Sequence, residues 1–213
     1  MNAISPTDAM AQSKFFLQLL DPATTRFCFR TFDDKKGAER TGLLSKRDGT
    51  VGQHTAQLRE LNDAEAGIYV VVNEGGQTDN DITRVRAVFA DIDNVDIPYE
   101  PIAEALTPHC VIESSPGKHH IYWLVHDGFP LDQFKPTQQA VAAKYGTDPS
   151  VCNLSRVMRL PGFKHNKDAP HAVQFKLQNK DLPRYSISEI ISGLGLSLGQ
   201  QQLPPKLTNS AVT

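Results

Sequence analysis

Two aspartates at the end of a strongly apolar segment are the residues of this chain best suited to bind a metal ion. Residues 87–90 are apolar and are followed by Asp91, Ile92 and Asp93. Because side chains alternate across a strand, Asp91 and Asp93 point to one face and Ile92 to the other. Adjacent carboxylates repel each other unless a cation lies between them, and Mg²⁺ and Mn²⁺ prefer oxygen ligands. The spacing predicts a divalent metal site, with a solvated strand-to-turn junction as the alternative.

A tight turn between two predicted strands, 110–113 and 119–125, is the second candidate. Its backbone N–H groups can bind a phosphate, and the ammonium group of Lys118 can supply positive charge. Alternation places His119 on the face that forms the core and His120, with Tyr122, on the less apolar face. An ordinary hairpin with a hydrogen-bonded histidine is the alternative. The candidate nucleotide-binding residues of this segment are Ser114, Ser115, Lys118 and His120.

The third candidate follows a helix predicted over residues 131–145 that ends at Gly146. Asp148 precedes Pro149, where we expect a new helix to begin, and an aspartate there can cap that helix as well as bind a metal. The new helix would place Arg156 and Arg159 on one face, which suits contacts with phosphate. Positive side chains just beyond it could line the same groove. The candidate nucleic-acid-binding residues are Lys164, His165 and Lys167.

Alternating helices and strands would position these residues. In the first 80 residues we expect a helix that begins at Ser5-Pro6 and ends before Asp21, and a strand over 25–32. A hairpin or loop through 42–49, a helix over 53–64 with Gly67 as its left-handed cap, and a buried strand over 68–72 follow. The polar stretch 75–80 predicts a domain boundary near residue 80.

The second half of the chain contains a β-α-β-β succession. Strands are predicted over 85–93, 110–113, 119–125 and 173–177, with a short helix over 102–106, and Ser186 with Glu189 forms a capping box for a final helix. Such alternation predicts a two-layer α/β (α+β) protein. It would consist of an N-terminal αβ subdomain over residues 1–80 and a subdomain over residues 81–195 that carries the candidate site. Residues 196–213 have the composition of a flexible tail or linker.

The composition narrows the class of protein. No apolar run approaches the roughly 20 residues that span a bilayer, and the N-terminus lacks the features of a secretory signal. We therefore expect a cytoplasmic protein with no membrane partner. The net charge of −2 excludes a globally basic nucleic-acid coat but not a local basic groove. The three cysteines stand far apart, so neither a disulfide framework nor a zinc knuckle is predicted.

In this order the motifs resemble those of the archaeo-eukaryotic primase superfamily, particularly the RepB-like primases of plasmids and the primase-polymerase domains of phages and mobile elements. The first motif of that superfamily is an apolar strand ending in Asp-x-Asp, here residues 91–93. The second, a serine-containing turn followed by a histidine, is similar to residues 114–120, with His120 as the better match. The third is a lone acidic residue after a helix, which Asp148 matches, and residues 155–163 are similar to the arginine-rich segment that follows it. The resemblance covers about residues 25–178.

This resemblance implies an RRM-like primase catalytic core that joins nucleotides on a single-stranded DNA template during replication of a plasmid, phage or mobile element. Asp91, Asp93 and Asp148 would hold two divalent ions, Mg²⁺ or Mn²⁺. Nucleoside triphosphates, NTPs or dNTPs, would contact the serine-containing turn together with Arg156 and Arg159. The linker-like end implies a fragment of a longer primase, with a helicase domain or a replication initiator as a further partner.

Two other classes of function stay open. One is a replication initiator that nicks DNA through a tyrosine nucleophile, but its metal site uses two histidines separated by one hydrophobic residue, whereas His119 and His120 are adjacent. A covalent protein–DNA adduct would identify it. The other is a non-catalytic module that binds an origin or single-stranded DNA. Three negatively charged carboxylates argue against it, because they do not help a protein that only binds phosphates. DNA binding that survives Asp91→Ala, without any synthesis, would identify it.

Overall fold

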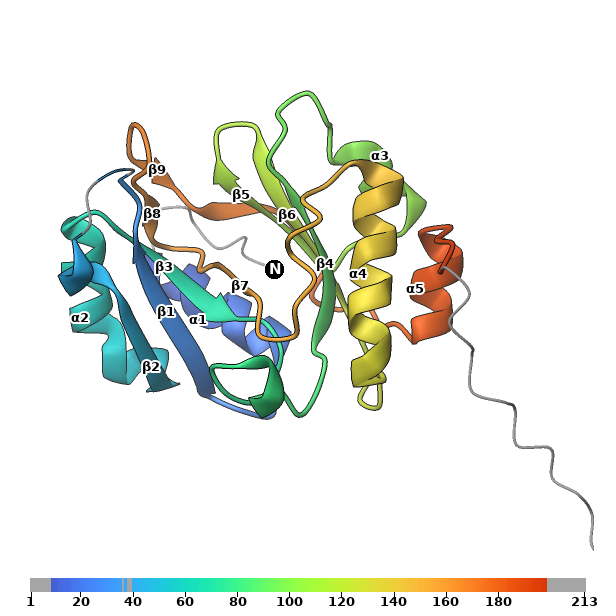
Figure 1. Cartoon of the computed structure of the whole chain (residues 1–213), viewed down its shortest axis with the longest axis horizontal. Helices are drawn as coiled ribbons and strands as arrows, with labels where there is room; N and C mark the ends of the chain where they lie inside the picture. The colour runs from blue at the N-terminus through green and yellow to red at the C-terminus, as the bar shows by residue number, and fades with distance from the viewer. Residues whose placement is uncertain (1–8, 36, 38–39, 199–213) are drawn as a thin grey trace, which may run out of the picture.

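Two antiparallel sheets of four strands each organise the chain (Figure 1). The structure is a computed structural model and describes residues 9–35, 37 and 40–198. Buried apolar side chains of both sheets join in one core, which includes Phe29, Val70, Phe89 and Trp123. The combination of helices with antiparallel sheets confirms the predicted α+β class.

The first sheet has the strand order β2-β1-β3-β7, and β7 reaches it from beyond residue 80. The sheet therefore draws strands from both sides of the predicted boundary. Helix α2 packs on this sheet, whereas α1 reaches the second sheet through Phe16, whose ring centroid lies 5.1 Å from that of Tyr122. The elements are α1 (Ala9–Leu20), β1 (Arg26–Asp33), a 3-10 helix (Thr41–Leu43), β2 (Ser45–Thr50), α2 (Val51–Asp63), β3 (Ala66–Val71) and β7 (Val157–Arg159).

Helix α2 begins at a capping box. Thr50 Oγ1 accepts a hydrogen bond from Gln53 N–H at 3.1 Å, and Gln53 Oε1 accepts one from Thr50 N–H at 2.9 Å. Gly67 does not cap the end of this helix, contrary to the sequence prediction, because Glu65 takes the left-handed conformation with φ 73°. Gly67 lies in β3, where an added Cβ would come within 2.5 Å of Asp34 Oδ1. Glycine is needed there for a close approach of side chains.

The second sheet has the strand order β10-β5-β6-β4, with the predicted strands at the predicted places. A two-stranded ribbon, β8-β9, lies between β7 and β10 in the chain. The predicted capping box of Ser186 and Glu189 opens α5. The elements are a 3-10 helix (Asp79–Asp81), β4 (Ala87–Ile92), α3 (Glu100–Ala105), β5 (Cys110–Ser115), β6 (Lys118–Leu124), α4 (Leu131–Tyr145), β8 (Lys164–His165), β9 (His171–Ala172), β10 (Gln174–Gln178) and α5 (Ile187–Gly193).

Helix α4 closes the open edge of β4 with one side chain, and Figure 1 shows the helix alongside that strand. Gln138 Oε1 accepts a hydrogen bond from Phe89 N–H at 3.1 Å, and its Nε2 donates to Phe89 O and Val151 O, both at 3.0 Å. Unpaired groups at a strand edge would otherwise be left buried without partners. The helix ends at Gly146, as predicted, where φ is 68°. The strand that carries Asp91 is therefore fixed along both edges.

The helix predicted to begin at Asp148 does not form. Residues 148–155 make turns, in which Asp79 Oδ1 accepts hydrogen bonds from Ser155 N–H at 2.8 Å and from Asn153 Nδ2 at 3.1 Å. Residues 157–159 then pair with the free edge of β3 as strand β7. Arg156 and Arg159 therefore share no helix face, because pairing with a distant strand overrides the local helical signal.

The face of β6 that carries His120 and Tyr122, predicted to be the less apolar one, is buried as well. Tyr122 is 0% exposed and His120 is 5% exposed. The rings of Phe16 and Phe89 pack against Tyr122, with centroids 5.1 and 6.1 Å away. The alternation of residues along β6 cannot show this, because the covering helix α1 is distant in sequence.

Two predictions fall outside the described residues: the helix start at Ser5-Pro6, and residues 199–213 of the tail predicted over 196–213. Among the helices that the structure describes, none has both the length and the apolar character needed to cross a membrane.

Candidate metal and nucleotide site

Three carboxylates meet at the end of strand β4. Asp91 belongs to the strand, Asp93 follows two residues later, and Asp148 comes from the turn after α4. One oxygen atom of each lies within 4.8 Å of the others. Asp93 is exposed, while Asp91 and Asp148 are half-buried. The fold thus brings together the three residues that the sequence proposed as metal ligands.

The backbone holds Asp148 beside Asp91. The N–H group of Asp148 donates a hydrogen bond to Asp91 O at 2.9 Å. The turn after α4 therefore pairs with the same edge of β4 that Gln138 binds at Phe89. The Asp148 carboxylate also closes its own turn, because Oδ1 accepts from Ser150 N–H and Oδ2 from Ser150 Oγ, both at 2.8 Å. Each carboxylate oxygen has two lone pairs. Capping of the turn therefore leaves capacity for a metal ion.

The Asp91 carboxyl group lies where its charge is disfavoured. Burial, and then the charges of Asp93 and Asp148, raise the pKa of Asp91 to about 7, although two nearby arginines act in the opposite direction. Within the described residues Asp91 Oδ1 accepts no hydrogen bond, and His120 Nε2 lies 3.5 Å from it. A divalent cation would remove the repulsion and supply the missing partner. The all-carboxylate donor set fits Mg²⁺ or Mn²⁺.

A cavity of about 220 Å³ opens beside the cluster. Six of the predicted contact residues line it: Ser114, Lys118, His120, Arg159, His165 and Lys167. The other three, Ser115, Arg156 and Lys164, are not among its lining residues. Lys164 Nζ instead lies 3.4 Å from Asp63 Oδ1, and Arg156 donates a hydrogen bond to Ser150 O. Most of the predicted basic and polar groups therefore surround one cavity.

Burial favours the neutral form of both histidines in the cavity wall. Burial lowers the pKa of His120 to about 3, and burial also lowers the pKa of His165. His165 Nδ1 lies 3.0 Å from Ser114 O, so this nitrogen donates and carries the proton. Positive charge in the wall therefore comes from Lys118, Arg159 and Lys167. Lys118 Nζ is 3.4 Å from Asp93 Oδ1.

Two residues of the site were not identified from the sequence. Tyr69 lines the cavity from β3, and Asp34, which follows β1, pairs with Arg159 through Oδ2–Nη1 and Oδ1–Nη2 distances of 3.0 and 2.8 Å. The register of β3 and β7 places Tyr69 opposite Arg159. No local pattern signals either residue, because Asp34 lies in a polar turn and Tyr69 in an apolar strand.

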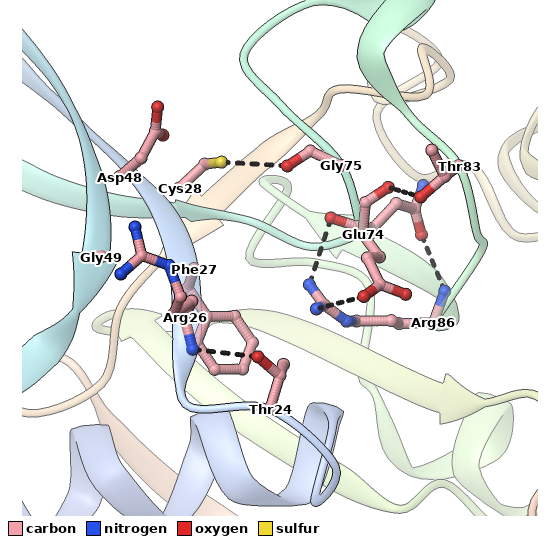
Figure 2. Close-up of a pocket in the computed structure, with 11 residues that line it drawn as sticks. Thr24, Arg26, Phe27, Cys28, Asp48, Gly49, Glu74, Gly75, Thr83 and Arg86 are labelled. Carbon is pink, nitrogen blue, oxygen red and sulfur yellow. Dashed lines mark hydrogen bonds and ion pairs between the residues drawn. The ribbon is translucent and has the colours of Figure 1, made fainter.

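A larger cavity, of about 370 Å³, lies where β1 begins and contains none of the predicted site residues (Figure 2). Its buried cation, Arg86, pairs with Asp21 through an Nε–Oδ2 distance of 2.9 Å and donates from Nη1 to Asn73 O at 3.3 Å. Cys28 Sγ donates to Gly75 O at 3.3 Å. Because these polar groups satisfy one another, this cavity is a weaker candidate than the one beside the carboxylates.

Comparison with known proteins identifies related primases. Residues 81–192 match the family described as RepB DNA-primase N-terminal domain. The AEP domain of the cyanophage S-2L primase-polymerase superposes with a TM-score of 0.71 at 22% identity, over 87% of this chain and 97% of that chain. Primase RepB′ gives 0.66 at 17% identity, over 88% and 61%. The catalytic domain of primase RepB′ in complex with initiator DNA gives 0.63 at 18%, over 88% and 92%. No curated protein matches the sequence.

The matched range contains the three clustered carboxylates and all of the basic and polar residues predicted to contact nucleotide or nucleic acid. It extends over more than half of the chain, and the structural likeness extends over both sheets. The chain therefore belongs to the family of RepB DNA-primase N-terminal domains and has the α+β fold of the archaeo-eukaryotic primases.

Proposed function

We propose that this chain is the catalytic domain of a DNA primase or primase-polymerase, which uses divalent ions to join nucleotides on a single-stranded DNA template. The proposal depends above all on the cluster of Asp91, Asp93 and Asp148 beside a cavity with Lys118 and Arg159 in its wall. Carboxylates alone would repel the phosphates of a nucleotide, and cations alone would bind them without chemistry. The combination suits nucleotidyl transfer.

Asp91, Asp93 and Asp148 would hold the ions. When bound, the ions activate the attacking 3′-hydroxyl group and stabilise charge on the leaving pyrophosphate. The hydrogen bond from Asp148 N–H to Asp91 O keeps these two carboxylates in a fixed relation. Since burial and the neighbouring carboxylates raise the pKa of Asp91 to about 7, Asp91 releases a proton when it binds a cation at neutral pH. The affinity for metal should therefore increase with pH.

The rest of the cavity wall would orient the nucleotide. Lys118 lies 3.4 Å from Asp93 and can move to a phosphate once the carboxylate binds metal. His120 is neutral and can offer a hydrogen bond but no charge. Arg156 does not line the cavity, but it is close enough to act on the carboxylate cluster. Burial raises the pKa of Asp91, and the positive charge of Arg156 opposes that rise.

The template would lie across the open face of the first sheet. Phe32 is 39% exposed, and its ring packs edge-on against Tyr69 with the centroids 5.3 Å apart. Exposed aromatic rings stack on unpaired bases without regard to sequence. His165 and Lys167, in the wall of the cavity next to Tyr69, are suited to contact the backbone of the strand.

Primer synthesis on single-stranded DNA tests the proposal. The wild-type chain and an Asp91→Asn/Asp93→Asn double variant are incubated with DNA of mixed sequence, labelled NTPs or dNTPs, and Mg²⁺ or Mn²⁺. Asp96→Asn, which neutralises an exposed acid in the next turn, is the matched control. We expect short labelled products from the wild type and the control, and none from the double variant.

Two results would contradict the proposal. If the wild type neither starts a chain nor extends an annealed primer with either metal, a module that binds single-stranded DNA without catalysis is the better interpretation. If the folded double variant retains full activity, the carboxylates do not hold the catalytic ions.

A further inference from the structure

Asp34 is a buried carboxylate whose oxygens accept hydrogen bonds from three other segments. Its side chain is 3% exposed. Arg159 donates to it from Nη2 and Nη1, at 2.8 Å to Oδ1 and 3.0 Å to Oδ2. Asn166 N–H donates to Oδ2 at 2.8 Å, and the hydroxyl of Tyr69 donates to Oδ1 at 3.4 Å. Asp34 therefore joins the end of β1 to β3, to β7 and to the residue that follows β8.

Gly67 makes room for this ion pair. A Cβ atom at Gly67 would lie 2.5 Å from Asp34 Oδ1 and 2.7 Å from Arg159 Nη1, so a larger residue would displace both partners. The ring of Tyr69 lies against the guanidinium, with its centroid 4.7 Å from the guanidinium carbon. The guanidinium of Arg159 is thus held by a carboxylate fork and an aromatic ring, which together fix its plane.

Stability alone is a weak explanation for such a buried pair, because the cost of desolvating two charges offsets most of their attraction. The preceding residue makes a pair that is open to solvent on one side, since Asp33, 8% exposed, pairs with Arg40, whose side chain is 38% exposed. Arg159, in contrast, lines the cavity together with Asp91. Its guanidinium is fixed next to the carboxylate cluster.

Arg159 keeps donors for a ligand. A guanidinium group carries five N–H bonds, and the fork with Asp34 uses one from each Nη nitrogen. The remaining N–H groups belong to a side chain that is 11% exposed and lies in the cavity wall. Because Asp34 balances the charge of Arg159, contacts made by these groups depend on their direction more than on long-range attraction.

We propose that Asp34 is a positioning residue: it holds the Arg159 guanidinium against Tyr69, so that the remaining N–H groups of Arg159 meet the phosphates of the incoming nucleoside triphosphate. This inference rests on the proposed function, since it takes the cavity as the nucleotide site. Asp34 itself contacts no substrate and acts through Arg159.

The variant Asp34→Asn tests this role. The amide keeps the size of the carboxylate, but its NH₂ group faces one Nη–H of Arg159, so two donors meet and the guanidinium must turn. We expect KM for the incoming nucleotide on a primed template to rise about tenfold, with kcat changed less than about twofold. The matched control is Asp33→Asn, which removes the neighbouring carboxylate but leaves Arg159 paired. Its KM should equal that of the wild type.

A double-mutant cycle separates positioning from a general structural role. Arg159→Lys keeps the positive charge and loses the fork, and we expect it to raise KM by about tenfold as well. If Asp34 acts through Arg159, the double variant Asp34→Asn/Arg159→Lys has the same KM as Arg159→Lys alone. If the two increases multiply, Asp34 acts independently of Arg159 and the proposal is wrong.

The remaining outcomes are equally decisive. If Asp34→Asn lowers the midpoint of urea unfolding but leaves KM unchanged, the pair is only structural and the proposal is overturned. If Asp34→Asn does not fold, Arg159→Lys decides, and an unchanged KM in that variant overturns the proposal.

Binding of a fluorescent deoxynucleoside triphosphate, measured without synthesis, separates this inference from the proposed function. If the wild type makes no primer, but the variant Asp34→Asn binds the nucleotide more weakly than the wild type does, the primase proposal is refuted and the positioning role is supported. If the wild type makes primers and Asp34→Asn binds the nucleotide as tightly as the wild type, the primase proposal is supported and the positioning role is refuted. A wild type that binds no nucleotide overturns both.

Discussion

The charge of Asp91, which the protein largely shields from solvent, should make the metal-free protein less stable as the pH rises. Burial, then Asp93 and Asp148, raise the pKa of Asp91 from 3.8 to about 7. Between these values the native state keeps a proton that the unfolded state has released, so the free energy of unfolding falls as pH increases. The loss is complete above about pH 7. A shift of about three pKa units corresponds to about 4 kcal/mol when Asp91 is fully ionised.

The variant Asp91→Asn removes the charge and keeps the shape, so it should lack this dependence on pH. In the presence of a chelator, the free energy of unfolding of the variant relative to that of the wild type should increase by about 3 kcal/mol between pH 5 and pH 8. This is less than the full value of about 4 kcal/mol because part of the cost of ionising Asp91 is already present at pH 5. For a chain of this size that gain corresponds to a relative shift in Tm of about 6–12 °C. Urea unfolding at the two pH values measures it directly.

The control is Asp96→Asn, which neutralises an exposed carboxylate and should follow the wild type at both pH values. If the free energy of unfolding depends on pH equally in the wild type and in Asp91→Asn, ionisation of Asp91 does not destabilise the folded protein. The argument that the cluster needs a cation would then lose its electrostatic basis.

Three further predictions concern metal, the edge of β4 and DNA. Millimolar Mg²⁺ or Mn²⁺ at pH 8 should raise the Tm of the wild type, measured by calorimetry, but not that of Asp91→Asn, because the cation binds the folded carboxylate cluster. Gln138→Leu should lower the free energy of unfolding by about 2–5 kcal/mol in urea titrations, because the N–H and C=O groups of Phe89 lose their partner. Phe32→Ala should weaken binding of single-stranded DNA by about tenfold in fluorescence anisotropy, whereas Val95→Ala, at another exposed apolar residue, should not.

Local rules were sufficient for part of the site. The apolar strand that ends at Asp91 and Asp93 could be recognised because alternation along a strand depends only on neighbouring residues. The same holds for α4 and its end at Gly146, where glycine takes the left-handed conformation at little cost. Asp148 lies two residues after Gly146, but its grouping with Asp91 was predicted from the resemblance to the primase motifs, because local rules left a helix cap as the alternative.

The rest of the site depends on contacts that no local pattern contains. A helix was predicted from Asp148 because aspartate before proline is a good helix start, but Asp79 binds Ser155 and the edge of β3 pairs with residues 157–159. Arg159 is held by an ion pair with Asp34, a residue that is distant from it in the sequence. Only the three-dimensional structure brings such residues together.

The late position of β7 in the chain has a consequence for synthesis on the ribosome. Strand β3 pairs with β1 along one edge, and its other edge stays unpaired until residues 157–159 have been synthesised. At about 5–20 residues per second, the segment between Val71 and Val157 takes on the order of ten seconds to translate. During that time the apolar strand Ala66–Val71 presents an unpaired edge, which can pair with other chains. Nascent chains that stall before Val157 should therefore aggregate or require a chaperone, whereas chains released after Arg159 can close the sheet.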